Sequence, residues 1–207
     1  TEEEVELPSS LKYSDGIELK EHQKEGLLRM QSLYKKSNVN GLLLCDDMGL
    51  GKTIQILSFL AWLKEKEALR PSLLIMPTSL ITNWYDEKNI GEIQKFFLDD
   101  TFKVKILDGK KSRDEISELR NYDLVLTSYE SLRINHKETG YIEWKVVVCD
   151  EAQKMKNPKT LLTTAVKTQN ALFKIACSAT PIENTVVDLW CLTAVSYTHL
   201  TLPTNRE

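Results

Sequence analysis

Short apolar runs alternate with segments of helical periodicity along this chain, and the alternation strongly constrains its fold. We expect strands at six places: 41–45, 72–76, 103–107, 123–127, 145–149 and 173–177. Several of these runs are apolar throughout, which is typical of strands that are covered on both faces. The pattern predicts an α/β domain with a mostly parallel central sheet and helices on both faces.

Helical periodicity between the apolar runs predicts helices at 21–36, 53–66, 80–97, 112–119, 160–168 and 183–193. With 207 residues, of which 42% are hydrophobic, the chain can bury a full core, and we favour one large domain. The apolar runs are far shorter than the about 20 residues that cross a bilayer. The acidic N-terminus is not a secretory signal, so we expect no membrane association.

A phosphate-binding loop is predicted where the first apolar run ends. Residues 46–53 read DDMGLGKT and lead into a periodic helix. Backbone N–H groups at the helix start would face phosphates, Lys52 would add a point charge, and the Thr53 hydroxyl would bind Mg²⁺. The usual pattern, GxxxxGKT or GxxxxGKS, begins with glycine, whereas this chain has Asp46 there. A turn rich in glycine and aspartate is the alternative interpretation.

Two adjacent carboxylates, Asp150 and Glu151, follow the apolar run 145–149. Ligands bind open α/β sheets at this end of the strands. Asp150 can hold Mg²⁺ while Glu151 polarises an attacking water molecule. A solvated acidic turn is the alternative.

A third polar segment, with Ser178 and Thr180, follows the run 173–177. These hydroxyls could hydrogen-bond the carboxylates or the terminal phosphate, although a strand-to-helix turn with a capping hydroxyl explains them equally well. The net charge of −3 gives no general attraction to phosphate backbones, so nucleic acid would need a local patch. The cysteines lack metal-binding spacing, and we expect buried, reduced thiols: Cys45, Cys149, Cys177 and Cys191.

Taken in order, the motifs from residue 19 to about 194 resemble the Swi/Snf-type DNA-dependent ATPases of helicase superfamily two. Residues 19–26 are similar to the segment that reads adenine in this family, which implies that Gln23 contacts the base. Residues 46–53 resemble the family's DEMGLGKT loop, so an initial aspartate is a family trait. The resemblance implies that Gln23 and the end of the loop bind ATP: Met48, Gly49, Leu50, Gly51, Lys52 and Thr53.

Two further segments, 74–84 and 123–130, are similar to the family's DNA-contact motifs. In such motors these loops touch backbone phosphates without reading sequence. The resemblance implies duplex DNA as a partner, contacted by Thr78, Ser79, Thr127 and Ser128. Trp84 and Tyr129, in the same segments, are alternatively core aromatics.

Residues 150–153 resemble the family's DEAH or DEAD box, and residues 178–184 resemble its coupling motif. The resemblance implies catalytic roles for Lys52, Asp150 and Glu151. It assigns Mg²⁺ to Thr53 and Asp150, and coupling to Gln153, Ser178 and Thr180. It also implies a RecA-like lobe in which the strand before Ser178 lies between the phosphate-loop strand and the Asp150 strand.

The expected organisation is an N-terminal extension at 1–18, the ATP-binding lobe at 19–194 and an atypical tail at 195–207. The tail resembles translated adaptor sequence joined to a truncated reading frame. Motors of this family need a second RecA-like lobe, whose arginine finger is worth roughly 10³ to 10⁵ in rate. Because no second set of motifs follows Asn184, we expect this chain to bind ATP weakly and to hydrolyse it slowly or not at all.

Three other functions remain open: a DEAD-box-like RNA helicase, a restriction-type translocase, and a nucleotide-binding module without catalysis. The DDMGLGKT loop and the DEAQ box favour a DNA translocase or remodelling ATPase over the RNA helicase. Intact Lys52, Asp150 and Glu151 argue against the non-catalytic module. Residues 150–158 look bacterial, so we expect a cytoplasmic, nucleoid-associated protein, or a nuclear one if the source is eukaryotic.

Overall fold

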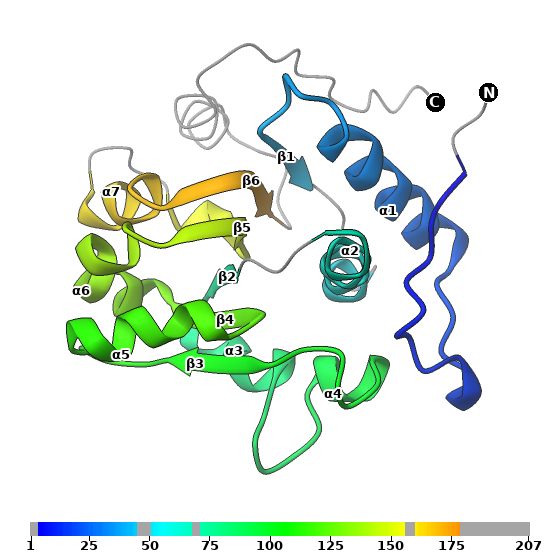
Figure 1. Ribbon diagram of the computed structural model, residues 1–207, viewed down its shortest axis with the longest axis horizontal. Helices are drawn as coiled ribbons and strands as arrows, with labels where there is room; N and C mark the ends of the chain where they lie inside the picture. The colour runs from blue at the N-terminus through cyan, green and yellow to red at the C-terminus, as the bar shows by residue number, and fades with distance from the viewer. Residues whose placement is uncertain (1–3, 45–50, 68–70, 156–159, 179–207) are drawn as a thin grey trace.

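The computed structural model describes residues 4–44, 51–67, 71–155 and 160–178. A parallel sheet with strand order β1-β6-β5-β2-β4-β3 lies at its centre (Figure 1). Its strands are β1 (Gly41–Leu44), β2 (Ser72–Met76), β3 (Val104–Leu107), β4 (Leu124–Ser128), β5 (Glu143–Cys149) and β6 (Asn170–Cys177). All six predicted strands are present within a few residues of their expected bounds. The expected position of β6 between β1 and β5 is confirmed.

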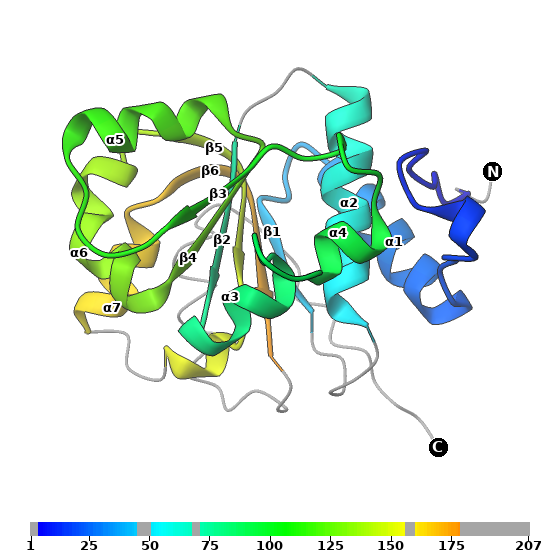
Figure 2. The same ribbon diagram turned by 90° about the horizontal axis from the view of Figure 1, so that it is seen from below.

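Helices cover both faces of the sheet (Figure 2). One face carries α1 (Glu21–Tyr34), α2 (Lys52–Lys66), α3 (Thr78–Trp84) and α4 (Glu92–Phe96), and the other carries α5 (Arg113–Glu118), α6 (Tyr129–Thr139) and α7 (Leu161–Lys167). Short 3₁₀ turns are η1 (Tyr13–Asp15), η2 (Leu119–Asn121) and η3 (Ala152–Lys154). Strand residues alternate between the two cores: Leu74 belongs to the first and Ile75 to the second.

Helix α2 is buried on all sides through its middle, from Ile54 to Leu63. A helix that is apolar all round belongs in a core. Phe59 stacks on Trp62 within α2, with ring centroids 5.8 Å apart, and also packs against Phe173 of β6 at 5.9 Å. This packing fixes the start of α2, which carries Lys52, relative to the sheet.

The predicted helix at 80–97 is wrong, because two short helices, α3 and α4, occupy this region. The backbone N–H of Lys88 donates to the Asp86 carboxylate at 2.8 Å, and that of Gly91 donates to Gln94 Oε1 at 2.8 Å. A Cβ atom at Gly91 would lie 2.7 Å from the Cα atom of Tyr85, so the chain turns back closely on itself there. Local turn chemistry therefore outweighs the helical pattern.

Helix α6 was not predicted from the sequence. Ser128 caps its start, because the Ser128 Oγ accepts a hydrogen bond from the Ser131 N–H at 3.0 Å. The face that it buries is partly polar and includes Asn135, whose Nδ2 donates to the Gly109 carbonyl at 2.7 Å. The apolar pattern is therefore too sparse to reveal the helix. The helix expected at 183–193 lies outside the described residues.

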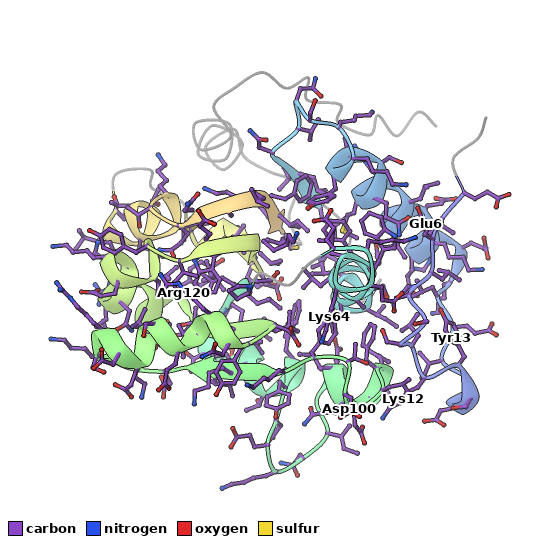
Figure 3. All side chains as sticks on the ribbon, viewed as in Figure 1. Glu6, Lys12, Tyr13, Lys64, Asp100 and Arg120 are labelled. Atoms are coloured by element: carbon purple, nitrogen blue, oxygen red, sulfur yellow. The ribbon has the colours of Figure 1, made fainter. Side chains whose placement is uncertain are left out.

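The N-terminal segment packs against the domain. The Leu98 N–H donates to the Ser10 carbonyl at 2.9 Å. The Glu6 carboxylate contacts Lys66 at 2.7 Å and Lys35 at 2.9 Å, and it accepts a hydrogen bond from the Trp62 indole at 3.3 Å (Figure 3 labels Glu6). Lys66, then Lys35 and Trp62, lower the pKa of Glu6 to about 2. The contribution of the charged Glu6 carboxylate to the stability of the fold is therefore complete above its ordinary pKa of 4.5. It is lost as the pH falls through about 2.

Cys149 and Cys177 are buried and form no disulfide within the described residues, as expected of these two thiols. Burial raises the pKa of Cys149 to about 12. Cys45 and Cys191 lie outside the described residues. Within the described ranges, every helix is too short or too polar to cross a membrane.

We expect Asp123→Ala to lower the free energy of unfolding by about 1–3 kcal/mol. Lys64 of α2 (labelled in Figure 3) and the Lys103 N–H both donate to Asp123 Oδ2 at 2.7 Å, and the Asp123 side chain is 10% exposed. Urea denaturation measures the loss. Asp99→Ala is the control, because Asp99 is 92% exposed and 3.6 Å from Lys12. Equal losses in both variants would contradict the prediction.

Candidate nucleotide and magnesium site

The candidate residues follow the carboxyl ends of neighbouring parallel strands. Asp150 follows β5, Ser178 follows β6, and the start of α3 follows β2. Because these strands run parallel, their ends meet at one edge of the sheet. The Ser178 N–H donates to the Leu44 carbonyl at 3.2 Å, which joins β6 to the strand that precedes the phosphate loop.

Gln23 and Gly51 lie against each other. Gln23 is 7% exposed, and its Oε1 accepts a hydrogen bond from the Lys20 N–H at 2.9 Å. Gly51 has a φ of 78°, in the left-handed region that favours glycine, and a Cβ atom there would lie 2.3 Å from Gln23 Nε2. Only glycine fits, so the predicted adenine-reading side chain adjoins the end of the phosphate loop.

Lys52 and Thr53 are the first two residues of α2, and both are half-buried. The first N–H groups of a helix have no partner within the helix, and this end of the helix dipole is positive, so a helix start suits phosphate. Met48, Gly49 and Leu50 lie outside the described residues. The described part of the loop is Gly51, which has a positive φ, and the first two residues of α2, and its binding of phosphate stays a prediction.

Asp150 is half-buried directly after β5, and its N–H donates to the Ile75 carbonyl at 2.8 Å. Burial raises the pKa of this carboxyl, and neighbouring Glu151 raises it further. The Glu151 N–H, Lys52 and Trp84 oppose the shift. Asp150 therefore sits where a bound cation would favour its charged form.

Glu151 has a φ of 52°, and it is the one described non-glycine residue with positive φ. Its N–H donates to Asp150 Oδ1 at 2.9 Å, which closes the turn. Gln153 Nε2 donates to Glu151 Oε2, and Ser178 Oγ donates to Gln153 Oε1 at 3.0 Å. A continuous chain of hydrogen bonds thus connects the end of β6 to the carboxylate predicted to activate water. Thr180 lies outside the described residues.

The residues fit Mg²⁺ and ATP. Among the described residues, no group of three or more His, Cys, Asp or Glu side chains could hold a metal ion alone. Mg²⁺ is commonly bound by one or two carboxylates together with phosphate oxygens, so Asp150 and Thr53 are a suitable donor set. Gly51, which approaches Gln23, and the helix start at Lys52 are suited to hold phosphates.

The predicted DNA-contact residues fall into two groups. Thr78 and Ser79 are exposed in the first turn of α3. Thr127 is buried, and its Oγ1 donates to the Leu107 carbonyl at 2.8 Å, while Ser128 Oγ is the cap of α6. The hydroxyls of this second pair are therefore engaged within the fold, and their contact with DNA stays a prediction.

Trp84 and Tyr129 are buried, at 3% and 2% exposure, as the core alternative held. Both also contact Asp150, which the sequence analysis missed. The Trp84 side chain lowers the pKa of the Asp150 carboxyl, and the Tyr129 hydroxyl donates to the Asp150 carbonyl at 2.7 Å. Burial raises the pKa of Tyr129 well above 10. The sequence offered one signal for a position near Asp150: Trp84 comes soon after β2 and Tyr129 directly after β4, and these two strands are neighbours in the sheet.

Comparison with known proteins identifies the family. The sequence profile of the SNF2-related domain matches residues 22–197. This chain belongs to the SNF2-related domain family. The Sulfolobus solfataricus SWI2/SNF2 ATPase core, solved in complex with dsDNA, superposes on this SNF2-related domain with a TM-score of 0.75 and 35% identity. The match covers 92% of this chain and 37% of that one, and it confirms the RecA-like fold.

Curated relatives are much longer than this SNF2-related domain. Zorya protein ZorD of Escherichia coli is 40% identical over 213 residues, which cover 91% of this chain and 19% of ZorD. The putative ATP-dependent helicase/translocase YwqA of Bacillus subtilis is 35% identical over 178 residues, or 84% of this chain and 18% of YwqA. The chain thus spans about a fifth of these relatives.

Proposed function

We propose that this SNF2-related domain is the ATP-binding lobe of an ATP-dependent motor that translocates on duplex DNA and remodels the proteins bound there. One observation carries the proposal. Lys52, the first residue of α2, acts electrostatically on Asp150, which follows β5, and favours its charged form. This influence supports a single site for the groups proposed to bind phosphate and Mg²⁺.

Each residue has a role that follows from its place. Gln23 contacts the base, and the backbone N–H groups at the start of α2 hold phosphates, with Lys52 as the charge partner. Thr53 and Asp150 would hold Mg²⁺, which when bound neutralises charge on the phosphate oxygens. Glu151 accepts a proton from the attacking water molecule. The hydrogen-bonded path through Gln153 and Ser178 carries the state of the site to β6.

Duplex DNA is the proposed partner. The support is the family relationship, the dsDNA in the Sulfolobus complex and the exposed first turn of α3 with Thr78 and Ser79. Hydroxyl groups at such a position contact phosphates without reading sequence. Thr127, Ser128 and Thr180 complete the proposed contact and coupling segments. We also propose a location with the DNA, in the bacterial nucleoid or in a nucleus.

Steady-state ATP hydrolysis by the full-length gene product tests this function. We expect stimulation by duplex DNA and little stimulation by RNA. Preferential stimulation by RNA would instead support a DEAD-box-like helicase, and an adjoining nuclease or methyltransferase domain would support a restriction-type translocase. For the 207-residue chain we expect Mg²⁺-dependent ATP binding with slow hydrolysis. Hydrolysis of several ATP molecules per second with DNA present would contradict the proposed need for arginines from a second lobe.

A further inference from the structure

Two buried aromatic side chains reach Asp150 from two different segments. Trp84 is the last residue of α3, and Tyr129 is the first residue of α6. The two helices follow β2 and β4, which are neighbours in the sheet, and β2 also pairs with β5, the strand that ends at Cys149 just before Asp150. Both aromatic residues therefore meet Asp150 at the same edge of the sheet.

Tyr129 holds the main chain of Asp150. Its hydroxyl donates to the Asp150 carbonyl at 2.7 Å, and its side chain is 2% exposed. The Asp150 N–H is already bonded to the Ile75 carbonyl of β2 at 2.8 Å. The peptide groups on both sides of the Asp150 side chain are thus fixed, one by β2 and the other by α6.

Trp84 acts on the other part of the same residue. Its buried side chain favours the charged form of the Asp150 carboxylate and so lowers its pKa. The opposite end of α3 is its first turn, where Thr78 and Ser79 are exposed. A seven-residue helix therefore has a solvent-facing turn at one end and a contact with the carboxylate at the other.

The segment before Tyr129 is equally well anchored. Thr127 Oγ1 donates to the Leu107 carbonyl at 2.8 Å, and Ser128 Oγ accepts from the Ser131 N–H at 3.0 Å. A displacement of this turn would therefore move the start of α6 as a unit. Since Tyr129 is the first residue of α6, the displacement would reach the Asp150 carbonyl.

We propose that Tyr129 and Trp84 are positioning residues that orient Asp150 toward Mg²⁺ and that join it to the two segments proposed to contact DNA. The inference rests on the proposed function. It adds a physical connection, because DNA held at the starts of α3 and α6 would act on one metal-binding residue through the buried Trp84 side chain and the Tyr129 hydrogen bond. By reciprocity, Mg²⁺–nucleotide would strengthen DNA binding by the same factor.

The first test uses Tyr129→Phe in the 207-residue chain, which removes the hydroxyl and keeps the ring. The affinity for a fluorescent ATP analogue is measured with Mg²⁺ and with EDTA. We expect the gain in affinity that Mg²⁺ provides to fall about three- to tenfold, as for the loss of one buried hydrogen bond, with the affinity in EDTA unchanged. A purely structural role would lower both affinities together.

Tyr141→Phe is the matched control, because the Tyr141 side chain is 82% exposed. Thermal unfolding establishes that each variant is folded. Trp84→Phe is the second variant, and we expect it to reduce the Mg²⁺-dependent gain in the same direction. It keeps the proposal testable if Tyr129→Phe does not fold, because Trp84 belongs to α3 and Tyr129 to α6.

The second measurement is the affinity of the analogue with Mg²⁺ in the presence and absence of a short duplex. We expect duplex DNA to raise this affinity in the wild type and to raise it several-fold less in either variant. Failure of the wild type to bind the analogue with Mg²⁺ would overturn the proposed function. The role of Tyr129 and Trp84 alone would be overturned by a different result. In that result the wild type binds the analogue, and both folded variants show the same Mg²⁺-dependent gain in affinity and the same effect of DNA as the wild type.

Discussion

Glu151→Gln is expected to abolish most ATP hydrolysis while leaving ATP binding intact. The carboxylate is the only group in the proposed mechanism that takes the proton of the attacking water molecule, and an amide cannot take it. Loss of such a base lowers the rate by about 10²- to 10⁴-fold. Single-turnover hydrolysis by the full-length gene product measures the chemical step, and titration with an ATP analogue measures binding.

The structure explains why this substitution isolates the chemistry. Glutamine has the size of glutamate, and it occupies the φ of 52° at this turn with similar strain. Its carbonyl oxygen can still accept the hydrogen bond from Gln153 Nε2. Glu118→Gln, at an exposed position of α5, is the control and should hydrolyse ATP at the wild-type rate. Hydrolysis by Glu151→Gln at a near wild-type rate would exclude Glu151 as the base.

Lys52→Ala is expected to weaken ATP binding by about 10- to 100-fold, the effect of losing a charge-assisted hydrogen bond to phosphate. Lys52 is the first residue of α2, and its positive charge acts on Asp150. Lys52→Ala removes this charge from the edge of the sheet where Asp150 and Glu151 lie. Phosphate would then meet uncompensated negative charge. Titration of the 207-residue chain with a fluorescent ATP analogue in Mg²⁺ measures the change.

Lys66→Ala is the matched control for Lys52→Ala. Lys66 ends the same helix, and its Nζ pairs with Glu6 at 2.7 Å. Because this pair is solvent-accessible, its loss should change stability by less than about 1 kcal/mol and should leave ATP binding unchanged. Equal ATP affinities for Lys52→Ala and the wild type would show that Lys52 does not contact the phosphates.

The sheet was predictable because its strands are buried on both faces and so read as apolar runs, as in Leu73, Leu74 and Ile75 of β2. The order of the strands came from the family resemblance, since an apolar run does not specify its neighbour. The helix predicted at 80–97 failed because the hydrogen bonds of Asp86 and Gln94 and the close approach at Gly91 depend on exact turn geometry. Helix α6 was missed because it buries polar groups such as Asn135.

The identities of the candidate site residues were predictable, but their partners were not. Motif order pointed to Lys52, Asp150 and Glu151, which the structure brings together. The hydrogen bond from Tyr129 to Asp150 and the effect of Trp84 on the Asp150 carboxyl connect residues far apart in the chain. Such contacts follow from the tertiary fold, and each aromatic side chain alone is equally compatible with simple packing.

The pairing of β1 has a consequence for how the domain matures. In the described sheet β1 lies at an edge and pairs only with β6, and Gly41 stands opposite Lys174. The strand that precedes the predicted phosphate loop can therefore pair only after β6, the last described strand, is available. Contacts so distant in sequence form slowly. During synthesis on the ribosome, the nucleotide site would be among the last features to form. ATP would then bind the completed domain and stabilise it as a whole, without guiding its earlier folding steps.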